Sequence, residues 1–343
     1  MAHELMLDEK GKALMFYVKD VPWHGLGTAL GKPPTAAEAI RAAKLDWEVI
    51  KTPLFHLPSL EATEALMDRY ALIPGKGWPE GKPRPVFGIA TGRYTALQNR
   101  EAFSFFDPMI RRGYATYETA GALGKGERVW VLAKLSGDME VGTGDRVQRY
   151  VLLSNRHDGH GAVRILFTPV RVVCQNTLSM AMQDGRRIGS ARHDGSLMPS
   201  LEMAAEEMME LIEVRYREIH EACKKLLKRK LAEADLRAYL AEIFPEPVKP
   251  EDVRMADRWK NARELALWSR AGSTRLYRTS PHCRMAGSTG WAAYNAVTEF
   301  VDHCRPANSP GRAPAAQLNR IWFGSGAQIK FRAFELAMRH FTN

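Results

Sequence analysis

The 343-residue sequence lacks several features that would assign it to a functional class directly. No apolar run approaches the roughly eighteen residues that a membrane-spanning helix needs. The first residues include acidic side chains and no continuous apolar stretch, so they do not resemble a signal peptide. We therefore expect a cytoplasmic protein without a membrane partner.

Cysteine is also scarce. Its four residues are scattered, which excludes a disulfide-rich scaffold and matches no zinc-ribbon spacing. The sequence has no P-loop, because its glycine-rich turn at residues 22–28 lacks the required spacing and the trailing Lys-Ser or Lys-Thr pair. A nucleophile elbow is likewise missing. The sequence therefore predicts no cofactor, no metal site and no hydrolase of the serine or cysteine class.

Positive charge is what the sequence has in excess. Lysine and arginine number 49 against 39 aspartate and glutamate residues, which gives a formal net charge of +10. A basic protein attracts polyanions over roughly a Debye length, and nucleic-acid phosphates are the strongest such partner in a cell. The charge therefore favours nucleic-acid binding, and the alternative is a basic solvated surface with no such role.

Strand patterns cluster in the middle of the chain. Residues 127–135, 150–154 and 162–174 show the alternation or the β-branched runs of strands, and a helix is predicted to begin at residues 175–177. Asp158-Gly159 is a turn pair that makes the last two strands antiparallel neighbours. We predict an α+β fold: an antiparallel sheet with a strand-strand-strand-helix core, followed by a mainly helical C-terminal region. Residues 1–195 and 196–343 are the expected domains.

Helix signals flank this core. Thr35 and Glu38 form a capping box that starts a helix ending near Ala43, and Asn99 is a predicted N-cap. Helical periodicity predicts further helices at residues 99–111, 199–231, 251–270, 288–301 and 327–341.

The polar face of the central strands carries the candidate binding residues. Arg156, Arg164 and Arg171 lie in or between the last two predicted strands, and Lys125 lies at the tip of the preceding predicted hairpin. The predicted contacts to nucleic-acid phosphates are Lys125, Arg128, Arg156, His157, His160, Arg164 and Arg171. In this interpretation His157 and His160 flank the polar tip of a hairpin that touches phosphate.

Two alternatives stand beside this interpretation. His157, Asp158 and His160 could supply a general base and metal ligands for a metal-dependent nuclease or phosphodiesterase. The other alternative is a structural or plasmid-maintenance protein, which predicts no salt-dependent binding to nucleic acid.

Short segments along most of the chain resemble a known family, the phage/plasmid-like proteins of unknown function found on phages, plasmids and integrated elements. The segments are residues 22–28 (PWHGLGT), 93–99 (RYTALQN), 118–121 (ETAG), 154–159 (SNRHDG), 169–178 (PVRVVCQNTL) and 293–299 (AYNAVTE). They follow the order of that family, whose name assigns no chemistry.

The order of three antiparallel strands and a helix is more distantly similar to the core of the Rad52-like single-strand annealing proteins. That resemblance implies a ring or filament of identical subunits that holds single-stranded DNA by its phosphates. Arg156, Arg164, Arg171 and Asn176 would be the matching residues. The predicted function is therefore single-stranded nucleic-acid binding and strand annealing for a mobile element, in recombination or replication. The expected partners are single-stranded DNA, with RNA as the alternative, and further copies of the chain.

Overall fold

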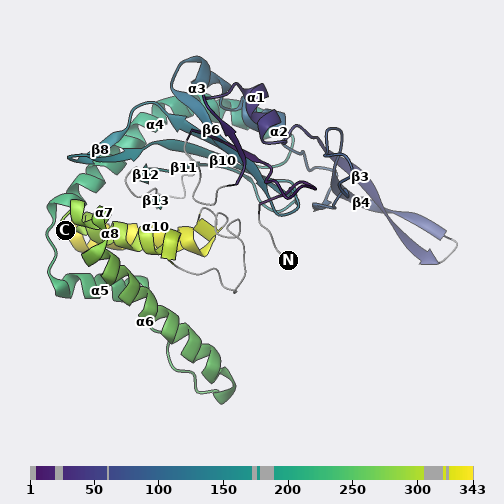
Figure 1. Cartoon of the computed structure of the whole chain (residues 1–343). Coiled ribbons are helices and arrows are strands. Elements are labelled where there is room, and N and C mark those ends of the chain that lie inside the picture. The colour runs from purple at the N-terminus through teal and green to yellow at the C-terminus, as the bar shows by residue number, and fades with distance from the viewer. Residues whose placement is uncertain are drawn as a thin grey trace.

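The computed structural model describes residues 5–19, 26–59, 62–171, 176–177, 189–304, 320–321 and 324–342. Antiparallel sheets form most of the N-terminal half of this part of the chain, and helices dominate the C-terminal half (Figure 1). This arrangement confirms the predicted α+β fold class. Of the described helices, none combines the length and the apolar character needed to cross a membrane.

The largest sheet has seven strands, and each neighbouring pair is antiparallel except for the parallel pair β1 and β2. In sheet order the strands are β14 (Gly189–Ala191), β11 (Val163–Phe167), β10 (Tyr150–Arg156), β7 (Arg128–Leu135), β6 (Ala115–Leu123), β1 (Met15–Val18) and β2 (Thr28–Leu30). The predicted trio of antiparallel strands is present as β7, β10 and β11, which lie side by side, but the third strand, predicted over residues 162–174, ends at Phe167.

The two faces of this sheet differ in what covers them. Because side chains alternate along a strand, Val129 and Val131 enter the large core under the helices, whereas Trp130 and Leu132 join a smaller apolar cluster on the other face. The helices that pack on the first face are α1 (Ala36–Ala42), α2 (Asn99–Ser104), α3 (Asp107–Arg111) and α4 (Leu197–Lys228) (Figure 1).

Local sequence explains two of these helices. The capping box predicted for α1 is present, with the Glu38 amide donating to Thr35 Oγ1 and the Thr35 amide donating to the Glu38 carboxylate. The apolar stripe of α4 is buried as its helical spacing predicts, at Ile212, Tyr216, Ile219, Cys223 and Leu226. Tyr216 also fastens α4 to β10, because its hydroxyl donates to the Tyr150 carbonyl at 2.7 Å.

Two smaller sheets extend the β part. The four-stranded sheet has the order β13 (Asn176–Thr177), β12 (Val170–Arg171), β9 (Asp145–Gln148) and β8 (Met139–Gly142). The three-stranded sheet has the order β3 (Val49–Ser59), β4 (Ala62–Pro74) and β5 (Gly88–Ala90). Figure 1 shows that β3 and β4 form a long hairpin that projects away from the rest of the molecule.

The helical part is organised around α8 (Gly290–Glu299), whose residues from Gly290 to Thr298 are all buried. The helix was predicted to start near residues 288–289, and Thr289 caps it by accepting from the Ala292 amide. The other elements here are α5 (Glu233–Ile243), the 3₁₀ turn η1 (Val253–Met255), α6 (Ala256–Thr279), α7 (Pro281–Met285), the π-helical turn η2 (Phe300–Cys304) and α10 (Ser325–Phe341). The packing of α6, α7, η2 and α10 on α8 ties the C-terminal helix to the body of the chain.

Several predicted helix positions were wrong. Asn176 and Thr177 are extended and form β13 instead of starting a helix, since their backbones pair with β12; residues 178–188 lie outside the described part. Asn99 is not an N-cap: it is buried, and its amide donates to the carbonyls of Leu45 and Trp47. The second long helix begins at Ala256 and continues to Thr279, and α5 and α7 were not predicted.

Candidate nucleic-acid interface

One end of the large sheet collects two tight turns. The turn between β6 and β7 contains Lys125 between two glycines with positive φ, Gly124 and Gly126. Antiparallel pairing of β7 with β10 brings this turn beside the one between β10 and β11, and the His157 amide donates to the Glu127 carbonyl at 2.7 Å. Residues from two separate hairpins therefore meet at one edge of the molecule.

Three arginines lie on one side of this edge. Arg128 of β7 is directly opposite Arg156 of β10, and Arg164 of β11 is opposite Ser154, two residues before Arg156. Since residues two apart on a strand share a face, all three side chains leave the sheet on the same side. Strands are about 4.8 Å apart, so the three arginines span roughly 10 Å. We call Arg128, Arg156 and Arg164 the arginine cluster.

The other two arginines of the cluster affect the pKa of Arg128. Burial lowers the pKa of Arg128, and the positive charges of Arg156 and Arg164 lower it further, while Asp158 and Glu127 act in the opposite direction. Burial is therefore the largest cause of the lowered pKa, and charges of both signs act on the Arg128 guanidinium. An anion bound at this point would relieve both the burial cost and the repulsion.

Asp158 is the carboxylate that orients the cluster. Both of its oxygens accept from Arg156 Nε, at 3.1 and 3.0 Å, and Oδ1 also accepts from the His160 amide at 2.9 Å. Burial by itself raises the pKa of Asp158, but these hydrogen bonds and the Arg156 charge outweigh burial and lower the pKa below its usual value. Asp158 therefore stays ionised at neutral pH and holds Arg156 in a fixed direction.

The tip of this hairpin rests on β5. A Cβ atom on Gly88 would lie 2.0 Å from the Asp158 carbonyl oxygen, so only glycine permits this approach. Gly159 has a φ of +77°, in keeping with the predicted Asp-Gly turn. His160 is exposed at the end of this fixed turn, beside the arginine cluster.

His157 lies on the opposite face from its neighbour Arg156 and is fully buried. Its ring packs against Trp47 and Phe87, and its Nε2 is 3.0 Å from Asn99 Oδ1. The predicted contact between His157 and phosphate is therefore wrong, because the alternation of β10 turns its ring into the core.

The hydrogen bonds of His157 also define its protonation state. The Asn99 amide nitrogen donates to two carbonyls, so Asn99 Oδ1 is an acceptor and His157 Nε2 must carry the proton. The other ring nitrogen, Nδ1, then faces the Asn155 amide at 3.5 Å as an acceptor. Burial, and next the nearby His193, lower the pKa of His157 to about 3, so the ring is neutral at pH 7.

These contacts engage both residues on which the nuclease alternative is based. His157 is engaged in the core, and Asp158 is bound to Arg156. Within the described part of the chain, no three His, Cys, Asp or Glu side chains gather so that they could hold a metal ion. The observed contacts of His157 and Asp158 are those of a structural unit.

Arg171 and Asn176 do not join the cluster. They are paired with each other in β12 and β13, and Arg171 also pairs with Val147 of β9, beyond the far end of β10. At about 3.3 Å per residue, the length of β10 separates that end from Arg156 by roughly 20 Å. Their side chains lie outside what the structure describes. The structure therefore splits the predicted set and places Lys125, Arg128, Arg156, His160 and Arg164 at the same edge.

Sequence patterns did not identify two neighbours of the arginine cluster, Tyr94 and His193. Tyr94 donates from its hydroxyl to the Arg156 carbonyl at 3.1 Å, and its ring stacks on His193 at 4.7 Å between ring centroids. His193 Nδ1 in turn is 2.9 Å from the Thr95 carbonyl. Both residues come from irregular segments, where no periodicity assigns a face. The one sequence signal for Tyr94 was its place in residues 93–99 (RYTALQN), a segment that resembles the phage/plasmid-like family.

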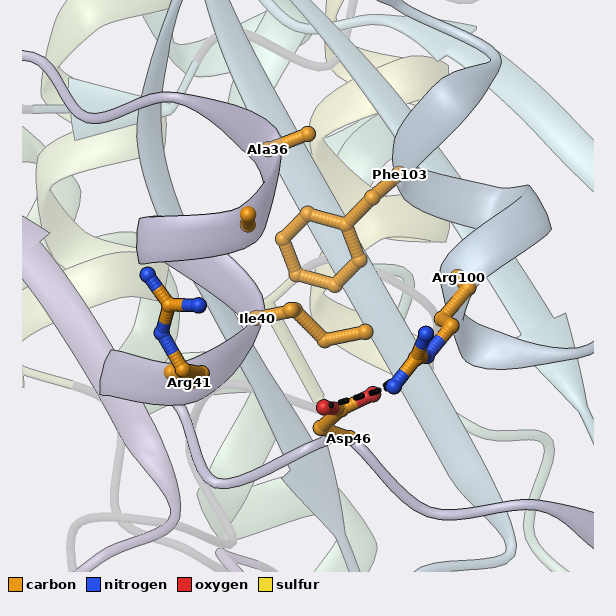
Figure 2. Close-up of a pocket in the computed structure, with 7 residues that line it drawn as sticks. Ala36, Ile40, Arg41, Asp46, Arg100 and Phe103 are labelled. Carbon is orange, nitrogen blue, oxygen red and sulfur yellow. Dashed lines mark hydrogen bonds and ion pairs between the residues drawn. The ribbon is translucent and has the colours of Figure 1, made fainter.

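A concave surface separate from the arginine cluster lies between α1 and α2 (Figure 2). It measures about 240 Å³ and is lined by Ala36, Ala37, Ile40, Arg41, Asp46, Arg100 and Phe103. Figure 2 shows Arg100 turned toward Asp46, with Arg100 Nε 2.6 Å from Asp46 Oδ1, and Arg41 on the other side of Ile40. Asp46 pairs with Arg100, and the charge of Arg41 acts on the nearby Glu38 carboxylate. The pocket is therefore a weaker anion site than the arginine cluster.

The helical part contains a buried ion pair of a different kind. Lys330 of α10 and Asp302 of η2 are 0% and 3% exposed, and Lys330 Nζ lies 2.8 Å from Asp302 Oδ1. Burial lowers the pKa of Lys330, and the Asp302 carboxylate opposes that effect. The pair joins the C-terminal helix to the end of α8 and presents no charge to solvent.

Comparison with known proteins gives one match. Residues 86–322 match a family described as a domain of unknown function (DUF932). The matched range contains the arginine cluster, the hairpin tip and α8. No curated protein and no solved structure matches the chain.

Proposed function

The chain belongs to the DUF932 family, and from its arginine cluster we propose that it binds single-stranded nucleic acid through the backbone phosphates. The observation that carries this proposal is the placement of Arg128, Arg156 and Arg164 on one side of three adjacent strands. Lys125 and His160 add exposed polar groups at the same edge.

The chemistry of arginine supports phosphate as the ligand. A guanidinium presents a planar fork of N–H donors that matches two phosphate oxygens, and it keeps its charge at all physiological pH values. The cluster spans roughly 10 Å, which is enough for neighbouring phosphates of one strand. The net charge of +10 adds long-range attraction to any nucleic acid.

The preference for single strands and the annealing of complementary strands are the finer parts of the proposal. Their support is limited to the three adjacent antiparallel strands β7, β10 and β11, which are one part of the element order that resembles the Rad52-like core; the helix expected next is strand β13. Phosphate contacts alone give little sequence preference, so we expect similar affinity for oligonucleotides of different base composition.

A fluorescence titration of labelled single- and double-stranded DNA at two salt concentrations tests the proposal, with an annealing readout on the same sample. The test variant is Arg128→Gln with Arg164→Gln, which removes two charges from the cluster. The matched control is Arg41→Gln with Arg84→Gln, two exposed arginines elsewhere on the chain. Each lost phosphate contact lowers the salt slope for single strands by about 0.7, so the test variant should lose about 1.4.

The control should keep most of the wild-type affinity and slope. Equal losses in both variants would remove the arginine cluster from the interface and leave only general attraction to a basic protein. Absence of binding at low salt would favour the structural alternative instead.

A further inference from the structure

The hairpin of β3 and β4, which we call the ribbon, is supported by neighbours only at its base. Its strands pair with each other along most of their length, and β5 pairs with β4 only from Tyr70 to Leu72. Beyond that point the ribbon makes no other strand pairing within the described residues. A two-stranded ribbon by itself is marginally stable in water, so a projecting one needs a partner surface.

Apolar side chains on the ribbon are open to solvent. Met67 is 93% exposed, Leu57 69% and Phe55 59%. Phe55 and Leu57 are two residues apart on β3 and therefore share a face. Large exposed apolar surfaces on otherwise folded proteins mark interaction sites.

The exposed large apolar residues gather at two places. Among the described residues there are fourteen of them, seven between Ile50 and Ile89 and four between Val248 and Trp268. The first group lies on and beside the ribbon. The second lies on α6 and the segment before it, and Figure 1 shows that α6 also projects from the molecule. The chain thus has two protruding apolar surfaces far apart in its sequence.

These two surfaces carry opposite charge. Residues 49–74 contain two cations, Lys51 and Arg69, against three anions, Glu61, Glu64 and Asp68, so the ribbon has a net charge of −1. Helix α6 contains six arginine and lysine residues against Asp257 and Glu264, and three of its arginines pair with Glu246 and Glu233 outside the helix, which leaves a net charge of +2 on this surface. Two ribbons would repel each other weakly, whereas a ribbon and an α6 helix attract.

We propose that the ribbon of one copy of this chain docks on α6 of a second copy. Met67 and Leu57 of the ribbon then cover the apolar patch at Leu267 and Trp268, whose side chains are 39% and 44% exposed. Because the two surfaces differ, the contact is head-to-tail, and repetition gives a ring if the rotation closes and a filament if it does not. This assembly is independent of the arginine cluster.

Sedimentation velocity on full-length protein freed of nucleic acid by nuclease and high-salt washing tests the interface. Wild type should sediment as a multiple of one chain. A ribbon variant, Leu57→Ser with Met67→Ser, and a helix variant, Leu267→Glu, should each sediment as a single chain. The control Val214→Glu replaces a 48% exposed residue on α4 and should keep the wild-type mass. Circular dichroism melts verify that each variant is folded.

A mixing experiment identifies the partner surface. The ribbon variant retains an intact α6 and the helix variant an intact ribbon, so an equimolar mixture should form a dimer through the one complete contact. A wild-type protein that sediments as a single chain overturns the proposal. So does a helix variant that keeps the wild-type mass, because the ribbon would then dock elsewhere.

Discussion

Lys330 and Arg128 both hold positive charge away from bulk water, but their surroundings differ. Lys330 meets the Asp302 carboxylate at 2.8 Å inside the helical part, so its charge is balanced within the chain. Arg128 is surrounded by two further arginines, and their repulsion adds to its burial cost. The first arrangement encloses both charges of a pair in the core, whereas the second gathers three positive charges at one edge of the sheet. The predictions that follow test this difference.

The largest effect is expected from breaking the balanced pair. Asp302→Asn leaves the Lys330 ammonium buried beside a neutral group, and Lys330→Met leaves the carboxylate of Asp302 without its ammonium. Each change should lower the free energy of unfolding by about 3–5 kcal/mol, measured by urea denaturation.

The double variant Asp302→Leu with Lys330→Met is the control for that pair. Replacing both charges by apolar groups of similar size removes the desolvation cost together with the attraction, so most of the lost stability should return. If the double variant is as unstable as the single ones, the pair does not account for the loss.

An intermediate effect is expected from pH, through His157. Its pKa is 6.5 in the unfolded chain and about 3 in the folded chain. Between these values the unfolded chain binds the proton and the folded chain does not, so stability falls as the pH drops below 6.5. At roughly 1.4 kcal/mol per pH unit, lowering the pH from 7 to 5 should cost about 2 kcal/mol.

Urea unfolding of wild type and His157→Gln at both pH values checks this expectation. The Gln amide can still donate to Asn99 Oδ1 but does not titrate, so the variant should lose this part of the pH dependence. An unchanged pH dependence in the variant would assign the acid sensitivity to other groups.

Asp158→Asn is expected to have the smallest effect on stability. It should lower the stability slightly and raise the affinity for nucleic acid. The variant loses the charge that pairs with Arg156 while keeping an oxygen for the His160 amide. Because the pair is partly exposed, stability should fall by about 1 kcal/mol or less. The arginine cluster becomes more positive, so affinity for single-stranded DNA should rise and its salt slope should steepen. A weaker affinity would mean that Asp158 positions Arg156 for binding more than it competes with phosphate.

Much of the fold could be predicted from local patterns. The capping box of α1, the buried stripe of α4, the start of α8 and the hairpins of the antiparallel trio are set by residues close in sequence, where spacing fixes geometry. The incorrect predictions concern residues whose conformation is set by contacts with residues far away in the sequence. Asn99 has the sequence context of an N-cap, but its amide donates to the carbonyls of Leu45 and Trp47. Asn176 is extended because its backbone pairs with β12.

The candidate site shows the same division. The sequence alone determined which cations follow one another around the hairpin and that neighbouring residues point to opposite faces. Only the tertiary structure decided that Arg156 faces outward and His157 inward, because strand alternation is symmetric until helices cover one face. It also decided that Arg128 joins Arg156 while Arg171 does not, since strand register, and not distance along the chain, brings residues together.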